Sequence, residues 1–376
     1  MTLLLLWGIC CQGGHFADQI LGKEKPPWHQ DGNTRIVFRE SSILLQMNDE
    51  APVEARLGFQ ATRILEVVAA NGSHVFGPNE YQISKDQRRL IFAKSGGVPV
   101  IKGKDLFPAP GSPNSYKHRV GHPDQNMLYG PGRWFHDRQV EVTYETEEPW
   151  VETKPGAKKD LLPKTIKKLL TKKDIRIALS GDSISTGLDA SFLVKAPPLQ
   201  KGYPDLLIGG LEKAFGARIV LTNRAVSGTS ISFGLSDWPK LVESKPDLVI
   251  VAYGMNDVGR RDPSWFGIRV KEFVTRINQD LPEAEIILVS PMLGNKEWIH
   301  TPAEMFGAYR DQLAALEKPG VALADVTSVW QTLLTHKHSH DLTGNGLNHP
   351  NDFGHRLYAW TLLALLEKPK TKRTSP

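Results

Sequence analysis

The sequence predicts a parallel α/β domain preceded by a smaller all-β domain, and two observations support this prediction. In the first part of the chain, short runs rich in β-branched and aromatic residues alternate with turn residues, which favours antiparallel strands. In the second part, apolar runs of strand length alternate with helical patterns, which is typical of a parallel sheet covered on both faces. The length of 376 residues suits two domains that each bury a core.

The predicted β domain extends over residues 30–150. Its candidate strands are short and are separated by turn signals such as Asn71-Gly72 and Gly96-Gly97. Residues 102–132 contain five prolines and are expected to form a long irregular excursion. The whole pattern favours a β-sandwich of the jelly-roll kind. The candidate strands begin at Arg35, Ile43, Arg63, Tyr81, Arg89 and Val140.

The positive charge of the chain is concentrated in a linker and a tail. Residues 151–173 are predicted to be a Lys-rich linker that runs into a short helix beginning near Pro163, and residues 369–376 a basic tail. The formal net charge is +5, but residues 154–173 hold eight lysines and one aspartate, and the end of the chain from Lys368 adds four cations. The rest of the chain is therefore net negative. Basic segments without interleaved aromatic residues argue against a nucleic-acid partner.

Both cysteines, Cys10 and Cys11, lie in an apolar N-terminal run. The run is too short to span a bilayer and suits the core of a signal peptide over residues 1–17, although it lacks a basic n-region. We therefore expect a secreted or periplasmic protein; a displaced start Met or a buried N-terminal strand is the alternative. The cysteine positions exclude an internal thiolate zinc site, and no other stretch suits membrane insertion.

The predicted α/β domain extends over residues 174–368. Ligands of parallel α/β sheets bind outside the carboxyl ends of the strands, so we expect the chemistry just after each apolar run. Strands are expected at residues 174–180, 218–222, 248–253, 285–290 and 321–326, and helices at residues 206–215, 266–281, 304–316 and 352–366.

Four blocks of polar residues have the order that such a site requires. Ser183, in Gly-Asp-Ser, follows the first strand and presents a hydroxyl and a backbone N–H at a strand-to-helix turn. Gly228 follows the second strand, Asn256 the third, and His349 precedes a proline near the C-terminus. Each block alone also fits a turn or a helix cap. Four such blocks in this order indicate a catalytic site far more specifically than any one block does.

The order of these blocks over residues 175–366 resembles the SGNH, or GDSL-type, hydrolase superfamily. The resemblance implies a flavodoxin-like three-layer α/β/α domain and ester hydrolysis. It implies Ser183 as nucleophile and His349 as base, with an oxyanion hole made by the N–H groups of Ser183 and Gly228 and the amide of Asn256. A serine needs an adjacent base at neutral pH, and each oxyanion donor contributes about 3–4 kcal/mol in the transition state.

The acid of the expected triad departs from the family pattern. The family usually places an Asp three residues before the catalytic His, and here that position is Gly346. Asp341 is our first candidate for the residue that orients the imidazole, Asp352 is the second, and a backbone carbonyl, which leaves a Ser–His dyad, is the third. His355 is a competing histidine, but the last helical pattern contains it, so we expect a surface or packing role.

Two further groups of side chains are interpreted as structural. Asp182 and Asp257 are expected to accept hydrogen bonds from loop amides. The alternate histidines His336, His338 and His340 could line a metal site, but no thiolate or further ligand cluster accompanies them, and we expect a solvated loop. A phosphate loop of the Walker type is absent from the sequence. We expect no metal and no cofactor.

The sequence thus predicts a two-domain serine esterase that acts on acyl, and first of all acetyl, esters. A β-sandwich ahead of such a hydrolase domain resembles the architecture of some carbohydrate esterases, so we expect an acylated polysaccharide or small molecule as substrate. One alternative is a glycan-binding protein on an inactive scaffold, which the missing Asp at position 346 favours. Another is a lipid or thioester hydrolase.

Overall fold

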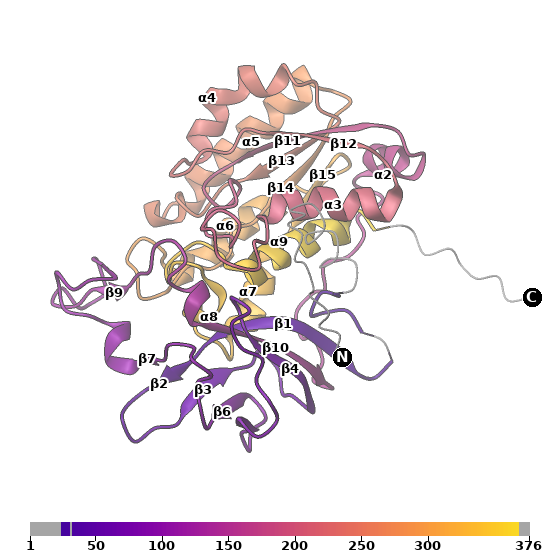
Figure 1. The fold of residues 1–376 in the computed structure, drawn as a ribbon. Helices are drawn as coiled ribbons and strands as arrows, with labels where there is room; N and C mark the ends of the chain where they lie inside the picture. Colours follow the sequence, from indigo (N-terminus) through magenta and orange to yellow (C-terminus); the bar gives the residue numbers. More distant parts are fainter. Residues whose placement is uncertain (1–23, 31, 368–376) are drawn as a thin grey trace, which may run out of the picture.

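The computed structural model describes residues 24–30 and 32–367. The predicted signal peptide, both cysteines and the basic tail lie outside these residues. The described chain forms an N-terminal β domain and a C-terminal α/β domain that pack against each other (Figure 1). Strand β1 (Arg35–Ile43) of the β domain contacts helices α8 (Ser339–Leu342) and α9 (Asp352–Leu365) of the α/β domain.

Five parallel strands form the sheet of the α/β domain, in the order β12-β11-β13-β14-β15. This order, with the first strand between the second and the third, is that of flavodoxin-like folds and confirms the predicted fold class. The first strand lies at the topological switch point, where ligands of open α/β sheets bind. The strands are β11 (Ile175–Gly181), β12 (Ile219–Asn223), β13 (Leu248–Ala252), β14 (Glu285–Val289) and β15 (Val321–Ala324).

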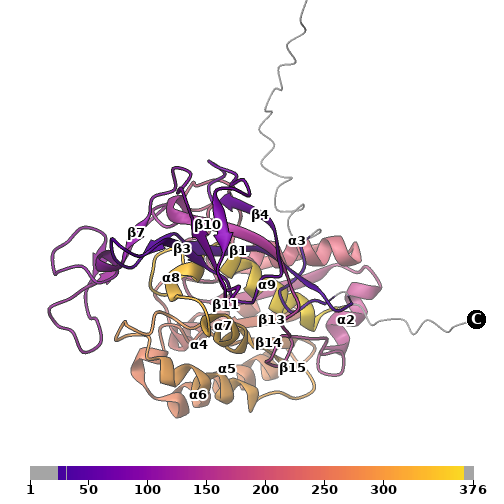
Figure 2. The ribbon, with the colours of Figure 1, turned by 90° about the horizontal axis from the view of Figure 1, so that it is seen from below.

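Helices cover both faces of this sheet. Helices α4, α5 and α6 pack side by side on one face, and α3 and α9 pack together on the other (Figures 1 and 2). No helix in the described part of the chain is long and apolar enough to cross a bilayer. The remaining helices of this domain are α2 (Pro163–Leu170), α3 (Tyr203–Phe215), α4 (Ile231–Val242), η3 (Val258–Arg260), α5 (Pro263–Asp280), α6 (Ala303–Ala314) and α7 (Val326–Leu334).

Two of these helices, α4 and α7, were not expected from the sequence. Helix α4 contains Gly234 and Pro239, which interrupt a helical pattern. The strand expected over residues 321–326 is shorter than predicted and ends at Ala324. The Asp325 carboxylate then accepts a hydrogen bond from the Ser328 N–H at 3.0 Å and begins α7, so the apolar run is divided between a strand and a helix.

The β domain contains two larger sheets. One has the order β1-β10-β4, and its strands pair antiparallel; the other has the order β5-β6-β3-β2-β7. These sheets confirm a separate β domain, but β2 and β7 pair in parallel, and the jelly-roll connectivity stays a prediction. The elements are β2 (Leu45–Gln46), β3 (Val53–Arg56), β4 (Arg63–Ala69), β5 (Tyr81–Ile83), β6 (Arg89–Phe92), β7 (Ile101–Lys102), η1 (Gly103–Leu106), β8 (Ser115–Tyr116), β9 (Met127–Leu128), η2 (His136–Arg138) and β10 (Gln139–Thr146).

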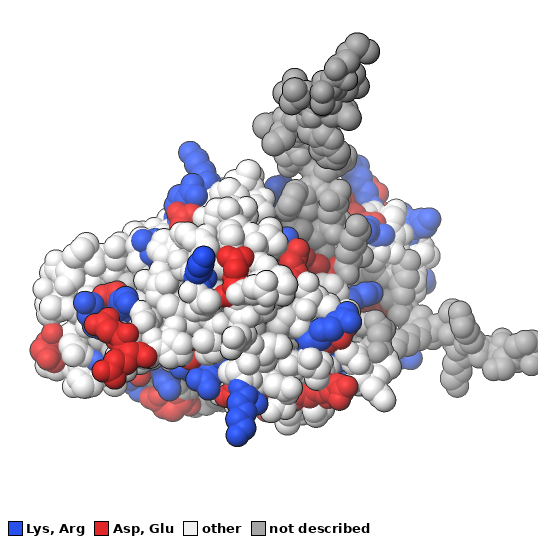
Figure 3. All heavy atoms as spheres, turned by 60° about the horizontal axis from the view of Figure 1, so that its bottom comes forward, with Lys and Arg blue, Asp and Glu red and all other residues white. Residues whose placement is uncertain are grey.

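The Lys-rich linker packs on the α/β domain, and its helix begins where expected. Helix α2 begins at Pro163 and buries Ile166 and Leu169. Three linker lysines form ion pairs with the α/β domain: Lys158 with Glu317 at 3.3 Å, Lys164 with Glu283 at 3.1 Å and Lys168 with Asp247 at 2.5 Å. On the face of the molecule shown in Figure 3, positive and negative side chains are interspersed.

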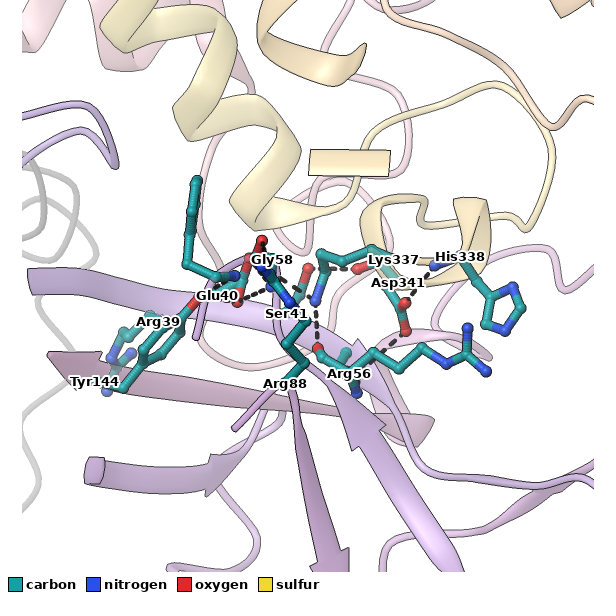
Figure 4. A network of polar contacts seen from close by, with 12 residues as sticks. Arg39, Glu40, Ser41, Arg56, Gly58, Arg88, Tyr144, Lys337, His338 and Asp341 are labelled. Carbon is teal, nitrogen blue, oxygen red and sulfur yellow. Dashed lines mark hydrogen bonds and ion pairs between the residues drawn. The ribbon is translucent and has the colours of Figure 1, made fainter. Parts of the chain in front are cut away.

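A buried network of polar contacts joins the two domains (Figure 4). Lys337, which follows α7, lies with its Nζ atom 3.9 Å from Oε1 of Glu40 in β1 and donates to the Arg56 carbonyl at 2.6 Å. The Glu40 carboxylate also accepts hydrogen bonds from the Tyr144 hydroxyl at 2.8 Å and the Gly58 N–H at 3.1 Å. Burial raises the pKa of Glu40, and the charge of Lys337 opposes that rise.

Candidate active site

Ser183, His349 and Asp189 form a hydrogen-bonded chain beside the carboxyl end of β11. The Oγ atom of Ser183 lies 3.0 Å from Nε2 of His349, and Nδ1 of His349 lies 2.7 Å from Oδ2 of Asp189. Nδ1 also lies 3.0 Å from Nδ2 of Asn345, and the shorter contact with the carboxylate favours a proton on Nδ1, because an unprotonated Nδ1 would place two acceptors 2.7 Å apart. Nε2 is then free to accept the proton of the serine hydroxyl, which is the geometry of a nucleophile, a base and an orienting acid.

The carboxylate beside His349 is thus Asp189 and not either of the two candidates from the sequence. The Asp341 carboxylate instead accepts hydrogen bonds from the Ile43 N–H at 2.9 Å and the His338 N–H at 2.8 Å. The Asp352 carboxylate accepts from a backbone N–H in the loop after β11. Both carboxylates are occupied in holding the backbone, which corrects our choice of Asp341 and Asp352. A carboxylate, and not the backbone carbonyl of the third alternative, lies at Nδ1 of His349.

Gly346 shows why a side chain at this position does not supply the acid. Its φ is +87°, and a Cβ atom there would lie 2.7 Å from the Leu128 carbonyl oxygen and 2.8 Å from the Phe135 ring. Real Cβ atoms essentially never approach so closely, so Asp cannot replace Gly346 without a local rearrangement. Leu128 and Phe135 belong to the β domain. The β domain therefore occupies the space of the expected acid, and the loop after β11 provides Asp189 instead.

The loop that presents His349 is held by Asn345, a residue that reasoning from the sequence missed. The side-chain oxygen of Asn345 accepts hydrogen bonds from the N–H groups of Leu347 at 2.8 Å and Asn348 at 3.1 Å. Its carbonyl accepts from the Gly130 N–H of the β domain at 3.1 Å. An Asn that bonds the backbone two residues later is a common turn former, so the Gly-Asn-Gly motif contained this signal.

The residues expected for the oxyanion hole follow three neighbouring strands, β11, β12 and β13. Gly228 has φ +78°, and a Cβ atom added there would have no neighbour within 4 Å, so its backbone lies in open space. Within residues 24–30 and 32–367, the N–H groups of Ser183 and Gly228 have no backbone or side-chain acceptor. The Asn256 amide donates one N–H to the Thr229 carbonyl at 2.8 Å, which leaves its second N–H for a ligand.

Asp182 and Asp257 have the structural contacts expected from the sequence. Oδ1 of Asp182 accepts from the Ile184 N–H at 3.0 Å, and Oδ1 of Asp257 accepts from the Ile231 N–H at 3.3 Å. Burial raises the pKa of Asp182 to about 7 and that of Asp257 to about 6. The residue before Ser183 is thus a carboxyl group whose charge is disfavoured by its surroundings.

His355 has the packing role expected, but it is buried and not at the surface. Its Nδ1 accepts from the Tyr203 N–H at 3.2 Å, and its Nε2 lies 3.2 Å from the Leu188 carbonyl. Burial lowers its pKa to about 4, so the ring is neutral near neutral pH. The histidine within hydrogen-bond distance of Ser183 is His349 and not His355.

The histidine-rich segment is not the solvated loop that we expected. His340 is buried and stacks on Phe135 of the β domain, with ring centroids 6.1 Å apart. Burial lowers the pKa of His340 to about 4. Among the described residues, no group of three or more His, Cys, Asp or Glu side chains is arranged to hold a metal ion.

The α/β domain is similar to one known protein family and to several solved structures. Residues 179–357 match the GDSL-like lipase/acylhydrolase family. Among solved structures, a catalytic mutant of an acetylxylan esterase from Geobacillus stearothermophilus is 19% identical with a TM-score of 0.43, covering 52% of this chain and 95% of that chain. A two-domain esterase active on acetylated mannans is 21% identical with a TM-score of 0.45, covering 58% of this chain and 57% of that chain.

A lipase from a goat rumen metagenome is 16% identical with a TM-score of 0.42, covering 51% of this chain and all of that chain. No curated protein sequence matches the chain. The matched residues 179–357 begin in β11 and end in α9, and they contain Ser183, Gly228, Asn256 and His349. The α/β domain therefore belongs to the GDSL-like lipase/acylhydrolase family, and the chain is a carboxylic ester hydrolase.

Proposed function

We propose that the chain hydrolyses acyl esters through a covalent intermediate on Ser183. The observation that supports the proposal is the hydrogen-bonded chain from Ser183 through His349 to Asp189. Oγ of Ser183 attacks the ester carbonyl carbon while Nε2 of His349 takes the hydroxyl proton. The bond from carbon to the leaving alcohol oxygen then breaks, and the imidazolium returns that proton to the alcohol. Asp189 stabilises the imidazolium between these steps.

The second half of the reaction reverses these roles with water. His349 removes a proton from water, the resulting hydroxide attacks the acyl carbon, and the bond to Ser183 Oγ breaks as Oγ regains a proton. In both halves a negative charge develops on the former carbonyl oxygen. The N–H groups of Ser183 and Gly228 and the second N–H of Asn256 would stabilise it, each by about 3–4 kcal/mol.

The substrate that we propose is a carbohydrate with acetyl ester groups. Gly228 and Asn256 are exposed, so the proposed oxyanion donors lie in an open site that a bulky alcohol can approach. The β domain lies directly against the His349 loop through the hydrogen bond from Gly130 to Asn345. A site bordered by an accessory domain suits a substrate that is larger than its acyl group.

Two measurements test the esterase reaction and its substrate. Wild type should hydrolyse 4-nitrophenyl acetate and bind a fluorophosphonate probe on Ser183, and Ser183→Ala should lose both properties. Wild type should also release acetate from a panel of acetylated xylans and mannans. A wild-type protein with neither turnover nor labelling would contradict the proposed mechanism, whereas turnover of the nitrophenyl ester without acetate release from any glycan would contradict only the substrate.

A lipid or thioester hydrolase is the second candidate, and one observation favours it. Phe192, Leu193 and Leu199 are exposed in the segment that follows Asp189. Such apolar side chains could contact a longer acyl chain. A series of nitrophenyl esters from acetate to palmitate separates the two candidates, because a carbohydrate acetylesterase should lose activity steeply beyond the shortest acyl groups. The inactive glycan-binding alternative is disfavoured by the contact between Ser183 and His349.

We propose secretion or a periplasmic location on the N-terminal sequence alone. The apolar run that supports this proposal lies in residues 1–17, outside the described residues. Expression of the full chain, followed by N-terminal sequencing of the protein from the medium or periplasm, would test it. A chain that keeps its first residues and stays in the cytoplasm would contradict the proposal.

A further inference from the structure

The irregular excursion expected over residues 102–132 begins after η1 in the structure, and residues 107–134, called the excursion below, extend from the β domain to the proposed active site. It projects at the left of Figures 1 and 2, where it includes β9. The Val120 N–H donates to the Glu297 carbonyl at 2.8 Å, and the Ile299 N–H donates to the His118 carbonyl at 3.1 Å. The excursion therefore adds a short β-bridge to the loop that follows β14 in the α/β domain.

The loop after β14 also forms hydrogen bonds with the residues that precede His349. The Asn295 N–H donates to the Leu347 carbonyl at 2.7 Å, and the Asn295 side chain donates to the Gly346 carbonyl at 2.9 Å. Together with the hydrogen bond from Gly130 to Asn345, these contacts join the excursion, the loop after β14 and the His349 loop into one fixed surface. Groups on the excursion thus have a defined position relative to the base.

Four aromatic side chains form a continuous row on this surface. Tyr129 lies 5.4 Å from Tyr116, Tyr116 lies 5.7 Å from Trp298, and Trp298 lies 5.0 Å from His300, measured between ring centroids. We call these four residues the aromatic row. The Trp298 contacts are edge-to-face, with interplanar angles of 88° and 72°, so each ring is held in a fixed orientation by its neighbours.

The aromatic row begins beside the catalytic groups and ends in solvent. Tyr129 directly precedes Gly130, whose N–H donates to the Asn345 carbonyl at 3.1 Å, and the side-chain nitrogen of Asn345 lies 3.0 Å from Nδ1 of His349, so Tyr129 lies close to the triad. Farther along the row, Tyr116 exposes 42% of its surface, and His300 is also exposed. The row therefore offers aromatic rings to a ligand that extends outward from Ser183.

We propose that the aromatic row is a subsite that binds a sugar ring of an acylated oligosaccharide next to the ester under attack. This inference rests on the proposed esterase function and names the part of the molecule that recognises the alcohol side of the substrate. A sugar ring has C–H groups on its faces and hydroxyl groups at its edge. Rings that combine an apolar face with a polar edge, as Tyr, Trp and His do, match both features.

Neither Arg119 nor His300 offers a free positive charge to the aromatic row. Arg119 of the excursion pairs with Glu297 at 3.5 Å and lies over the Phe107 ring, so its charge is matched locally. Burial and the neighbouring His118 lower the pKa of His300, which is therefore neutral near neutral pH.

The test compares a sugar ester with a small ester in the same variants. We expect Tyr116→Ala to lower kcat/KM for short acetylated xylo-oligosaccharides about tenfold more than kcat/KM for 4-nitrophenyl acetate, because an exposed aromatic anchor typically contributes about a tenfold factor. Tyr116→Phe keeps the ring and should restore most of this selectivity. Ile268→Ala, at an exposed apolar position on α5, is the matched control and should leave the ratio unchanged.

A binding measurement without turnover separates this inference from the esterase proposal. In the Ser183→Ala background, Tyr116→Ala should weaken the Kd for the same acetylated xylo-oligosaccharides about tenfold by calorimetry. An unchanged Kd, an equal loss on both esters, or a loss confined to long-chain esters would overturn the inference. Absence of turnover and of probe labelling in wild type would instead overturn the proposed reaction, while the Kd comparison would still decide whether the row binds sugar.

Discussion

Lys337 and Glu40 form an ion pair across the domain boundary, with Nζ 3.9 Å from Oε1 and neither side chain exposed to solvent (Figure 4). Taking two charges out of water is unfavourable unless hydrogen bonds satisfy both groups. Here the Arg56 carbonyl accepts from Lys337, and the Tyr144 hydroxyl and the Gly58 N–H donate to Glu40. The pair therefore fixes how the two domains meet, beside the segment that leads to the His349 loop.

Removal of the lysine charge should destabilise the chain strongly. We expect Lys337→Met to lower the free energy of unfolding by about 3–5 kcal/mol, because the Glu40 carboxylate would stay buried without its counter-ion. Urea unfolding monitored by tryptophan fluorescence measures this change. The double variant Glu40→Gln/Lys337→Met should recover most of the loss. If the losses of the two single variants simply add in the double variant, the two charges do not interact.

The role of Asp189 predicts a large kinetic effect from a conservative change. Asp189→Asn should lower kcat for 4-nitrophenyl acetate on the order of 10³- to 10⁴-fold, because the amide cannot stabilise the imidazolium and favours the wrong tautomer of His349. Asp341→Asn is the informative control. Its carboxylate holds backbone N–H groups of Ile43 and His338, so it should lose stability but keep its activity per folded molecule. If Asp341→Asn loses activity and Asp189→Asn keeps it, Asp341 and not Asp189 is the acid.

His136 connects the β domain to the triad and should act as a positioning residue. This buried side chain lies with Nε2 3.0 Å from the Asp189 carbonyl oxygen. His136→Ala should lower kcat about 10- to 100-fold with little change in KM, because Asp189 loses its fixed position. His136→Gln keeps a donor and should recover part of kcat.

A double variant tests whether His136 acts through Asp189. In the Asp189→Asn background, His136→Ala should cause little further loss of kcat, because the group that it positions is already impaired. Multiplicative losses in the double variant would show that His136 affects the reaction by another route, such as general destabilisation of the fold.

The sequence was sufficient to predict the strands and helices that have a clear local pattern of apolar residues or a proline at their start. The apolar runs predicted all five parallel strands to within a few residues, and Pro163 marked the start of α2. The residues expected at the site, Ser183, Gly228 and Asn256, follow adjacent strands, because the carboxyl ends of parallel strands share one edge. Their roles in catalysis remain proposals that the kinetic variants address.

The carboxylate beside His349 was not predictable from the sequence, because contacts between the domains decide which one lies there. Only the fold shows that Leu128 and Phe135 fill the space beside Gly346, which prevents a side chain from standing there. Asp189 belongs to no sequence motif. It lies in a loop six residues after Ser183, and its own φ angle is +61°. In the same way, the burial of His340 results from packing against Phe135, far away in the sequence. Such long-range contacts leave no local pattern.

The raised pKa of Asp182 predicts a pH dependence of stability that a single substitution should reduce. Burial raises this pKa from 3.8 to about 7, so between these values the folded state keeps a proton that the unfolded state has lost. This group therefore makes the free energy of unfolding fall as pH rises from about 4 to 7. The Asn side chain of Asp182→Asn cannot ionise. From pH 5 to pH 8, the free energy of unfolding of this variant should therefore rise by about 2 kcal/mol relative to that of wild type. Urea unfolding of both proteins at pH 5 and pH 8 measures this change. If the difference in free energy of unfolding between wild type and the variant is the same at both pH values, Asp182 is already ionised in the folded protein.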